Sequence, residues 1–178
     1  MPGPARAGFA LWLTGLPSSG KTTLAHALSG LLRERGIAVQ ILDSDELRCR
    51  LTPNPVYSAE ERDWFYNTVT FLAELLTANG VNVLIAATAS RRAFRQRARG
   101  RIARFAEVYV ACLPEVCRAR DPKSLWERAD RGEITSLPGV GAVYEAPRAP
   151  EATVDTDRHS PQAAAHHILR QLDEQDFF

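Results

Sequence analysis

Short apolar runs alternate along this chain with segments whose apolar residues recur every three or four positions. The runs are typical of buried strands, and the wider spacing is typical of helices with one buried face. Regular alternation of the two indicates a parallel sheet covered by helices on both faces, so we expect an α/β fold with roughly five strands. The expected strands are Phe9–Thr14, Ile37–Leu42, Val81–Ala87, Ala106–Ala111 and Ala152–Asp155.

Helical spacing fills most of the chain between these runs. Ser58 and Glu61 have the S-x-x-E form of a capping box, which predicts the start of a long helix. The segment from Gly132 to Pro150 contains Gly and Pro and has little periodicity, so we expect a loop there. The expected helices are Lys21–Arg35, Ser58–Asn79, Arg91–Arg104, Pro114–Arg120, Lys123–Arg131 and Pro161–Asp173.

Composition narrows the possible function classes. The chain has 178 residues, 45% of them hydrophobic, and a formal net charge of +1, which predicts one domain over residues 1–178. A near-neutral charge argues against bulk attraction to nucleic acid or to an anionic membrane, and no apolar run approaches the ~20 residues of a membrane span. The odd set of cysteines has no C-x-x-C pair, which favours a reducing, cytoplasmic location over a disulfide scaffold and does not suggest zinc.

One stretch departs from the neutral balance. Residues 91–104 are rich in Arg and contain no acidic residue. A nucleic-acid surface is one interpretation, but the overall charge does not support it. We favour a solvated helix face, with contacts from one or two of these residues to an anion as an alternative, for which Arg92 is the candidate.

The most specific motif lies between the first expected strand and the helix after it. Residues 15–22 fit the pattern G-x-x-x-x-G-K-[ST]. In this motif main-chain N–H groups and the helix N-terminus surround phosphate oxygens, the Lys reaches the β- and γ-phosphates, and the last hydroxyl binds Mg²⁺. Lys21 is one of only two lysines among 22 cationic residues, which supports a chemical role for it. The sequence therefore predicts a nucleoside triphosphate site with Lys21 on the phosphates and Thr22 on Mg²⁺.

Two carboxylates follow the second expected strand. The N-K-x-D and D-x-x-G motifs of switch GTPases are absent from the sequence, and the third expected strand ends without an acidic residue. Asp43 and Asp45 belong at the strand ends beside the nucleotide motif, where ligands bind in open α/β sheets. A carboxylate there can hold Mg²⁺ or accept a proton from an acceptor hydroxyl, and one of the two can instead cap the next helix. Because phosphoryl transfer requires water exclusion, we expect Arg118–Pro150 to form a lid.

Several segments taken together resemble adenylylsulfate kinases, the P-loop kinases that phosphorylate the 3′-hydroxyl of adenylyl sulfate. They occur in the order of that family, and R-D-P-K followed by G-E-I and Y-E-A-P is the most telling set. The resemblance implies a P-loop NTPase fold with a mobile lid, and ATP and Mg²⁺ as cofactors. The matching segments are Gly15–Thr23, Leu42–Leu47 with Arg48, Ser58–Arg62, Phe105–Val110, Glu115–Lys123, Gly132–Ile134, Tyr144–Pro147 and Val154–Thr156.

The resemblance also implies roles for individual residues. Lys21 and Asp45 would be catalytic, with Asp45 as the base for the acceptor hydroxyl. Thr22 would bind Mg²⁺, with Asp43 as a further candidate ligand. The nucleotide would contact Gly15, Leu16, Pro17, Ser18, Ser19, Gly20, Lys21, Thr22, Thr23 and Arg120. The acceptor, a small molecule rather than a nucleic acid or membrane, would contact Asp43, Arg48, Arg62, Phe65, Arg92 and Lys123.

Departures from the family pattern concentrate on the acceptor half of the site. Phe65 and Asn67 stand where the family has Asn and Arg, and Ala87 replaces an aromatic residue that stacks on the acceptor adenine. Thr135 and Leu137 replace a Lys and a Phe of the lid, and Ser44 replaces a Gly. Trp64, Phe65 and Tyr66 are candidates for a replacement stacking surface. Two alternatives therefore stay open: a related kinase for another nucleotide-like or phosphorylated acceptor, and a regulatory nucleotide-binding domain without catalysis. The sequence leaves a homodimer open as well.

Overall fold

Five parallel strands form the central sheet in the order β2-β3-β1-β4-β5. The computed structural model describes residues 7–178, so residues 1–6 of the expected domain lie outside the described part. The expected α/β architecture and strand number are confirmed, with shifts of one or two residues at several strand ends. The strands are β1 (Ala10–Thr14), β2 (Val39–Asp43), β3 (Asn82–Ala86), β4 (Phe105–Ala111) and β5 (Ala152–Asp155).

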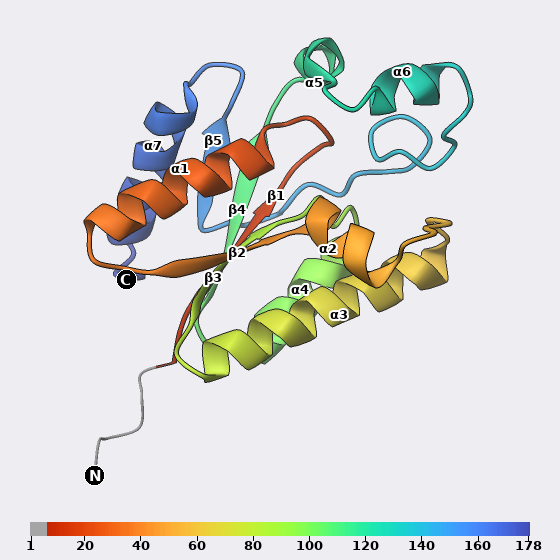
Figure 1. Ribbon diagram of the computed structural model, residues 1–178. Helices are drawn as coiled ribbons and strands as arrows, with labels where there is room; N and C mark the ends of the chain where they lie inside the picture. The colour runs from red at the N-terminus through yellow and green to blue at the C-terminus, as the bar shows by residue number, and fades with distance from the viewer. Residues whose placement is uncertain (1–6) are drawn as a thin grey trace.

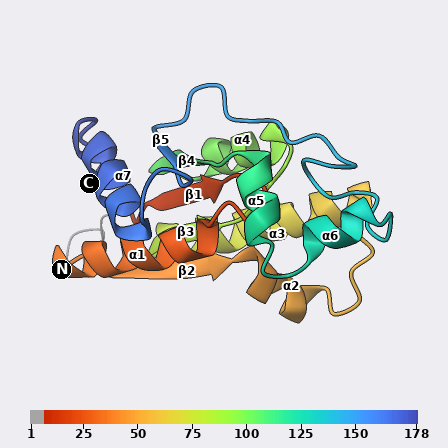
Figure 2. The same ribbon diagram turned by 90° about the horizontal axis from the view of Figure 1, so that it is seen from above.

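Helices cover both faces of this sheet (Figure 1). On one face lie α1 (Lys21–Glu34) and α7 (Pro161–Asp173), which pack against each other; on the other face lie α3 (Ala59–Ala78) and α4 (Arg92–Arg101). Three shorter helices gather at the carboxyl ends of the strands, as Figures 1 and 2 show. They are α2 (Ser44–Leu51), α5 (Pro114–Arg120) and α6 (Leu125–Asp130).

The central strand explains why the sheet is buried on both faces. All five residues of β1 are buried, as its apolar sequence ALWLT predicts. Alternate side chains enter opposite cores: Leu11 and Leu13 pack with α1 and α7, whereas Trp12 packs with residues of α3 and α4. This double burial holds the end of β1 rigidly, and the nucleotide motif begins there.

The expected lid has a small core of its own. Residues 131–151 contain no helix or strand. Cys117, Trp126, Ala129 and Leu137 are buried together, separately from the two cores of the sheet. Leu137, expected at an acceptor position, is therefore a packing residue of this lid core in the structure. None of the helices within residues 7–178 is long and apolar enough to cross a membrane.

Candidate functional site

The nucleotide motif forms a tight loop from the end of β1 to the start of α1. Gly20, the N-cap of α1, has φ = 94°, a conformation that glycine adopts without the penalty of a side chain. A Cβ at Gly15 would lie 2.4 Å from the Val110 carbonyl oxygen, so only glycine fits between β1 and β4. The loop thus folds as the motif predicts, with the N-terminus of α1 directed at the phosphate position.

Lys21 lies against the loop that precedes it. Its Nζ donates to the Leu16 carbonyl at 2.7 Å and to the Gly15 carbonyl at 3.2 Å. Burial lowers the pKa of Lys21 to about 8, while the nearby carboxylates of Asp45 and Asp43 oppose that shift. The fraction of Lys21 that carries a charge therefore changes within a pH range accessible to experiment.

Asp43 joins the nucleotide motif to α2. Its Oδ2 accepts a 2.6 Å hydrogen bond from Thr22 Oγ1, and its Oδ1 accepts from the Asp45 main-chain N–H at 2.8 Å. A hydroxyl and a carboxylate oxygen side by side fit Mg²⁺, which is bound by one or two protein oxygens together with substrate phosphates. Asp43 therefore caps α2, the alternative role that the sequence left open for one of the two acids, and Asp45 lines the cleft.

A cleft of about 600 Å³ lies between the nucleotide motif and the lid. Asp45 and Lys123 meet in it: the Lys123 ammonium contacts Asp45 Oδ2 across the cleft from the lid side. Both side chains are more than half exposed, at 63% and 53%, so this ion pair is weak and can separate. Both lysines of the chain thus line the same cleft.

A second cavity of about 280 Å³ adjoins the first at Gly20, Thr23 and Arg120. The Arg120 guanidinium donates to the Thr156 carbonyl at 2.6 Å. No carboxylate lies within 4.0 Å of it in the part of the chain that the structure describes. A planar guanidinium held from one side, beside the end of the phosphate loop, leaves a face on which a nucleobase can stack.

The predicted acceptor residues Arg48, Arg62 and Phe65 come together at the start of α3. Arg48 is paired with Glu61 at 2.8 Å, and its guanidinium lies 3.8 Å from the centre of the Phe65 ring. Phe65 itself has no exposed surface. The Phe65 ring therefore packs against the Arg48 guanidinium and does not line the cleft. The capping box is half formed: Ser58 accepts from the Glu61 N–H, but the Glu61 carboxylate binds Arg48 through Oε1 and accepts from the N–H groups of Val56 and Tyr57 through Oε2.

Arg62 is the better placed of the two cations to bind an anion. Its Nη2 donates to the Ser136 carbonyl at 2.9 Å, and its Nε donates to the Tyr57 carbonyl at 3.0 Å. Within residues 7–178 no carboxylate lies within 4.0 Å of its guanidinium. Burial lowers the pKa of Arg62 from its ordinary, very high value. A half-buried cation bound only to neutral groups is stabilised by an anion that reaches it.

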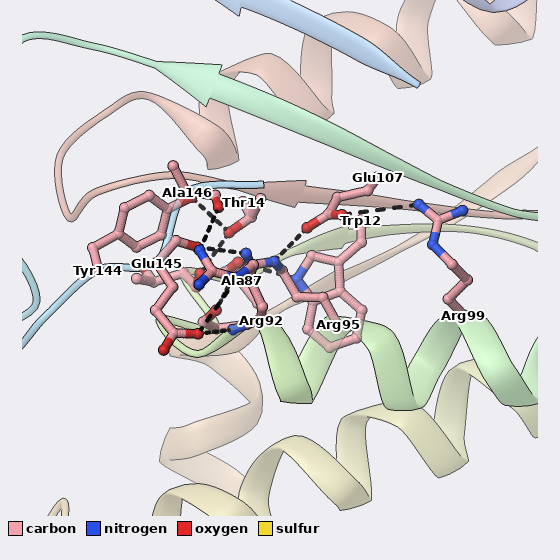
Figure 3. Close-up of polar contacts among 12 residues, drawn as sticks. Trp12, Thr14, Ala87, Arg92, Arg95, Arg99, Glu107, Tyr144, Glu145 and Ala146 are labelled. Carbon is pink, nitrogen blue, oxygen red and sulfur yellow. Dashed lines mark hydrogen bonds and ion pairs between the residues drawn. The ribbon is translucent and has the colours of Figure 1, made fainter. Parts of the chain in front are cut away.

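The Arg-rich segment is engaged with the rest of the protein. Arg95 is 1% exposed, so the expected solvated face is wrong for that residue. Arg97, Arg99 and Arg101 pair with Asp63, Glu151 and Glu74. The Arg92 guanidinium donates to the Ala146 carbonyl at 3.1 Å, as Figure 3 shows. Arg92 thus binds the base of the lid, residues 144–146, in this structure, and its expected contact with the acceptor stays a prediction.

The replacement stacking residues are not brought to the cleft. Tyr66 is buried, and its Oη accepts a hydrogen bond from the Ala89 N–H. Trp64 is 49% exposed but lines a separate shallow hollow with Asn67. The sequence interpretation also missed a polar network around Arg95 and Tyr144. The sequence feature that could have indicated this network is Glu107, an acidic residue in the middle of an otherwise apolar strand.

Comparison with known proteins agrees with this geometry. The family model for adenylylsulphate kinase matches residues 7–155. A probable adenylyl-sulfate kinase of Pyrococcus abyssi is 44% identical over 94% of this chain and 96% of its own length. An adenylyl-sulfate kinase of Rippkaea orientalis is 42% identical over 94% of this chain and 92% of its own length.

Solved structures give the same result. The Mycobacterium tuberculosis APS kinase CysC in complex with AMPPNP and APS superimposes with a TM-score of 0.87 at 31% identity, covering 94% of this chain and 98% of that one. The shikimate kinase of Aquifex aeolicus, with a TM-score of 0.61 at 18% identity over 94% of this chain and 98% of its own, shares the fold.

Proposed function

Because this chain belongs to the adenylylsulfate kinase family, we propose that it transfers the γ-phosphoryl group of ATP to the 3′-hydroxyl of adenylyl sulfate. The products would be 3′-phosphoadenylyl sulfate and ADP. The observation that carries the proposal is the cleft in which the phosphate loop, the Thr22–Asp43 pair and the Asp45 carboxylate meet. No other part of the described chain combines a triphosphate cradle with an exposed carboxylate that lines the same cleft.

On the donor side, the phosphate loop and Lys21 bind the triphosphate, and Arg120 stacks on the base. Thr22 and Asp43 would hold Mg²⁺, which would supply positive charge to neutralise the phosphates of the nucleotide. Lys21 must leave the carbonyls of Gly15 and Leu16 for the phosphate oxygens, which are stronger acceptors because they are charged.

On the acceptor side, Asp45 accepts the proton of the attacking hydroxyl. The ion pair of Asp45 with Lys123 must open first, and its high exposure makes that opening easy. Arg62, which has no carboxylate partner in the described chain, holds the anionic group of the acceptor with help from Arg48. Transfer is direct and in line, with no enzyme-bound phosphate.

A second candidate function is supported by the loss of stacking surfaces. Ala87 replaces the aromatic residue of the family, Leu137 is buried in the lid core, and Phe65 and Tyr66 are buried in the main core. An acceptor without a stacked adenine would suit such a site better. The second candidate is therefore a kinase of the same mechanism whose acceptor is another phosphorylated or nucleotide-like alcohol.

Acceptor-dependent release of ADP tests the proposal. Purified protein is given ATP, Mg²⁺ and one acceptor at a time: adenylyl sulfate, AMP, other nucleoside diphosphate derivatives or a short oligonucleotide. We expect stimulation by adenylyl sulfate, and none by the oligonucleotide. Stimulation only by a different small molecule would select the second candidate. ATP binding without stimulation by any acceptor would instead indicate a regulatory domain and overturn both.

The assembly and the location of the protein are further proposals. We propose a cytoplasmic protein that acts on a small molecule and on no nucleic acid or membrane, and the homodimer that the sequence leaves open is the assembly to test. A relative from Thiobacillus denitrificans is described as a hexameric APS kinase, but this chain spans only 31% of it. Light scattering on a sizing column separates the states: a mass near 39 kDa supports the dimer, twice the 19.7 kDa of one chain, and a mass near 20 kDa contradicts it.

A further inference from the structure

The loop after β3 is held in an unusual conformation at the edge of the cleft. Its residue Ala89 has φ = 40°, in the left-handed region that non-glycine residues seldom adopt. Two buried side chains bind its peptide groups: its N–H donates to Tyr66 Oη at 3.0 Å, and its carbonyl accepts from Arg95. The preceding residue, Thr88, lines the cleft. Such strain persists only where surrounding groups hold it.

Arg95 ties that loop to two other segments. From α4 its guanidinium reaches Glu107 in β4, the Ala89 carbonyl and, at 2.6 Å, the Glu145 carbonyl (Figure 3). Arg95 is 1% exposed and the Glu107 side chain 12%, so the charge is compensated inside the protein. One buried side chain therefore fixes the loop after β3 relative to the base of the lid, residues 144–146.

A chain of hydroxyl groups makes the same connection by a second route. Tyr144 Oη lies 3.0 Å from Thr14 Oγ1, and Thr14 Oγ1 donates to the Thr88 carbonyl at 2.7 Å (Figure 3). A threonine hydroxyl has one hydrogen, and a carbonyl can only accept. Tyr144 must therefore be the donor to Thr14. The hydrogen bonds are therefore donated in one direction, from Tyr144 at the base of the lid to Thr14, and from Thr14 to the carbonyl of Thr88, which lines the cleft.

The same base of the lid is bound twice more by this loop. The Glu145 N–H donates to the Ser90 carbonyl at 2.8 Å, and its carboxylate accepts from the Arg92 N–H at 2.8 Å. None of these contacts involves Lys21, Thr22 or Arg120, the groups on the donor side. The network thus reaches the cleft at Thr88.

From these contacts we propose that Tyr144 and Arg95 are positioning residues for the acceptor. They hold the loop Thr88–Ser90 in its strained form and fix it to the base of the lid. The surface of the cleft that contacts the acceptor is then preformed before the acceptor binds. Because the side chains of this loop are small, its backbone conformation determines the shape of the cleft wall. The network holds that conformation. The inference rests on the proposed function only for the choice of acceptor in the assay.

The test uses Tyr144→Phe, which removes one hydroxyl and keeps the ring stacked on Tyr109. Loss of one neutral hydrogen bond should raise the KM for the acceptor about 3- to 10-fold. The KM for ATP should stay within about twofold, because donor contacts are untouched. Tyr109→Phe is the matched control: its hydroxyl has no hydrogen bond within the described chain, so both KM values should stay unchanged.

Two further variants separate positioning from simple destabilisation. If the hydroxyl chain is real, Thr14→Val combined with Tyr144→Phe raises the acceptor KM no more than Thr14→Val alone. Arg95→Lys keeps the charge but cannot reach three acceptors, so its effect on the acceptor KM should exceed that of Tyr144→Phe. Arg97→Lys, on the same helix but with a side chain that is 33% exposed and paired with Asp63, is its control.

Amide hydrogen exchange makes the test independent of the acceptor's identity. In Tyr144→Phe the amides of Ala89 and Glu145 should exchange several-fold faster than in the wild type, and in Tyr109→Phe they should not. Equal rises in both KM values, or unchanged exchange at Ala89 and Glu145, would overturn the inference. Failure of the proposed function would give a different result: the wild type would not turn over adenylyl sulfate, but the amides of Ala89 and Glu145 would still exchange faster in Tyr144→Phe.

Discussion

Lys21 should take up a proton when ATP binds. Its pKa is lowered to about 8 by burial, whereas a bound triphosphate brings several negative charges to the ammonium and raises the pKa well above that value. At pH 8 about half of the free protein carries a neutral Lys21, so ATP binding should consume about 0.5 proton from this group. The uptake should fall to about 0.1 proton at pH 7 and rise to about 0.9 at pH 9.

Calorimetric titration with MgATP measures this uptake directly. The binding enthalpy is compared between two buffers of different ionisation enthalpy, at each pH from 7.5 to 9. Lys21→Met is the control, because it removes the titrating group and should abolish the rise in proton uptake. A proton uptake that does not change with pH in the wild type would refute the placement of Lys21 in a desolvated site.

The same shift makes a prediction for the free protein's stability. The unfolded chain holds the Lys21 proton up to about pH 10.5, whereas the native state releases it from about pH 8. Native stability should therefore rise with pH between these values, because the unfolded state then binds more protons. The Cys117 thiol, whose pKa burial raises to about 12, opposes this rise above about pH 9. The difference between wild type and Lys21→Met in chemical denaturation isolates the contribution of Lys21.

Three substitutions test the remaining parts of the site. Asp45→Asn should lower kcat by at least about 100-fold, while calorimetry shows ATP affinity unchanged; near-normal turnover would remove Asp45 from the mechanism. Arg62→Met should raise the acceptor KM by at least about 10-fold, because a charge-assisted hydrogen bond is lost; an effect on ATP affinity alone would contradict the role of Arg62 in acceptor binding. Gly15→Ala should abolish ATP binding, since its Cβ would meet the Val110 carbonyl oxygen at 2.4 Å; retained affinity would contradict the tight fit of the phosphate loop.

The sequence predicted the sheet because its strands are specified locally. The run FALWLT is apolar throughout, as a central strand buried on both faces requires, and it becomes β1. The bounds of β5 and α7 agree with the expectation, helped by the Ser–Pro start of the helix at Ser160. Val81 is excluded from β3 because its N–H closes the end of α3 on the Leu76 carbonyl. The phosphate loop was equally predictable, because its motif is contiguous.

The acceptor side was less predictable because its contacts join distant segments. The Arg-rich sequence of α4 predicts a solvated helix face. Arg95 is nevertheless buried, because it donates to Glu107 and to two main-chain carbonyls. Phe65 looked available for stacking, but it lies beneath Arg48. The contact of Lys123 with Asp45 spans the cleft between the lid and α2. Neither the spacing of apolar residues in a helix nor a local motif indicates which distant residues will contact each other.

The most direct test of the central claim is the position of the transferred phosphate. Protein, Mg²⁺, ATP labelled in its γ-phosphate and adenylyl sulfate are incubated, and the labelled product is isolated and examined by ³¹P NMR. We expect one labelled product whose new phosphate is an ester of the 3′-hydroxyl, formed in equal amount to ADP. Label found only in inorganic phosphate, or on a group other than that hydroxyl, would contradict it.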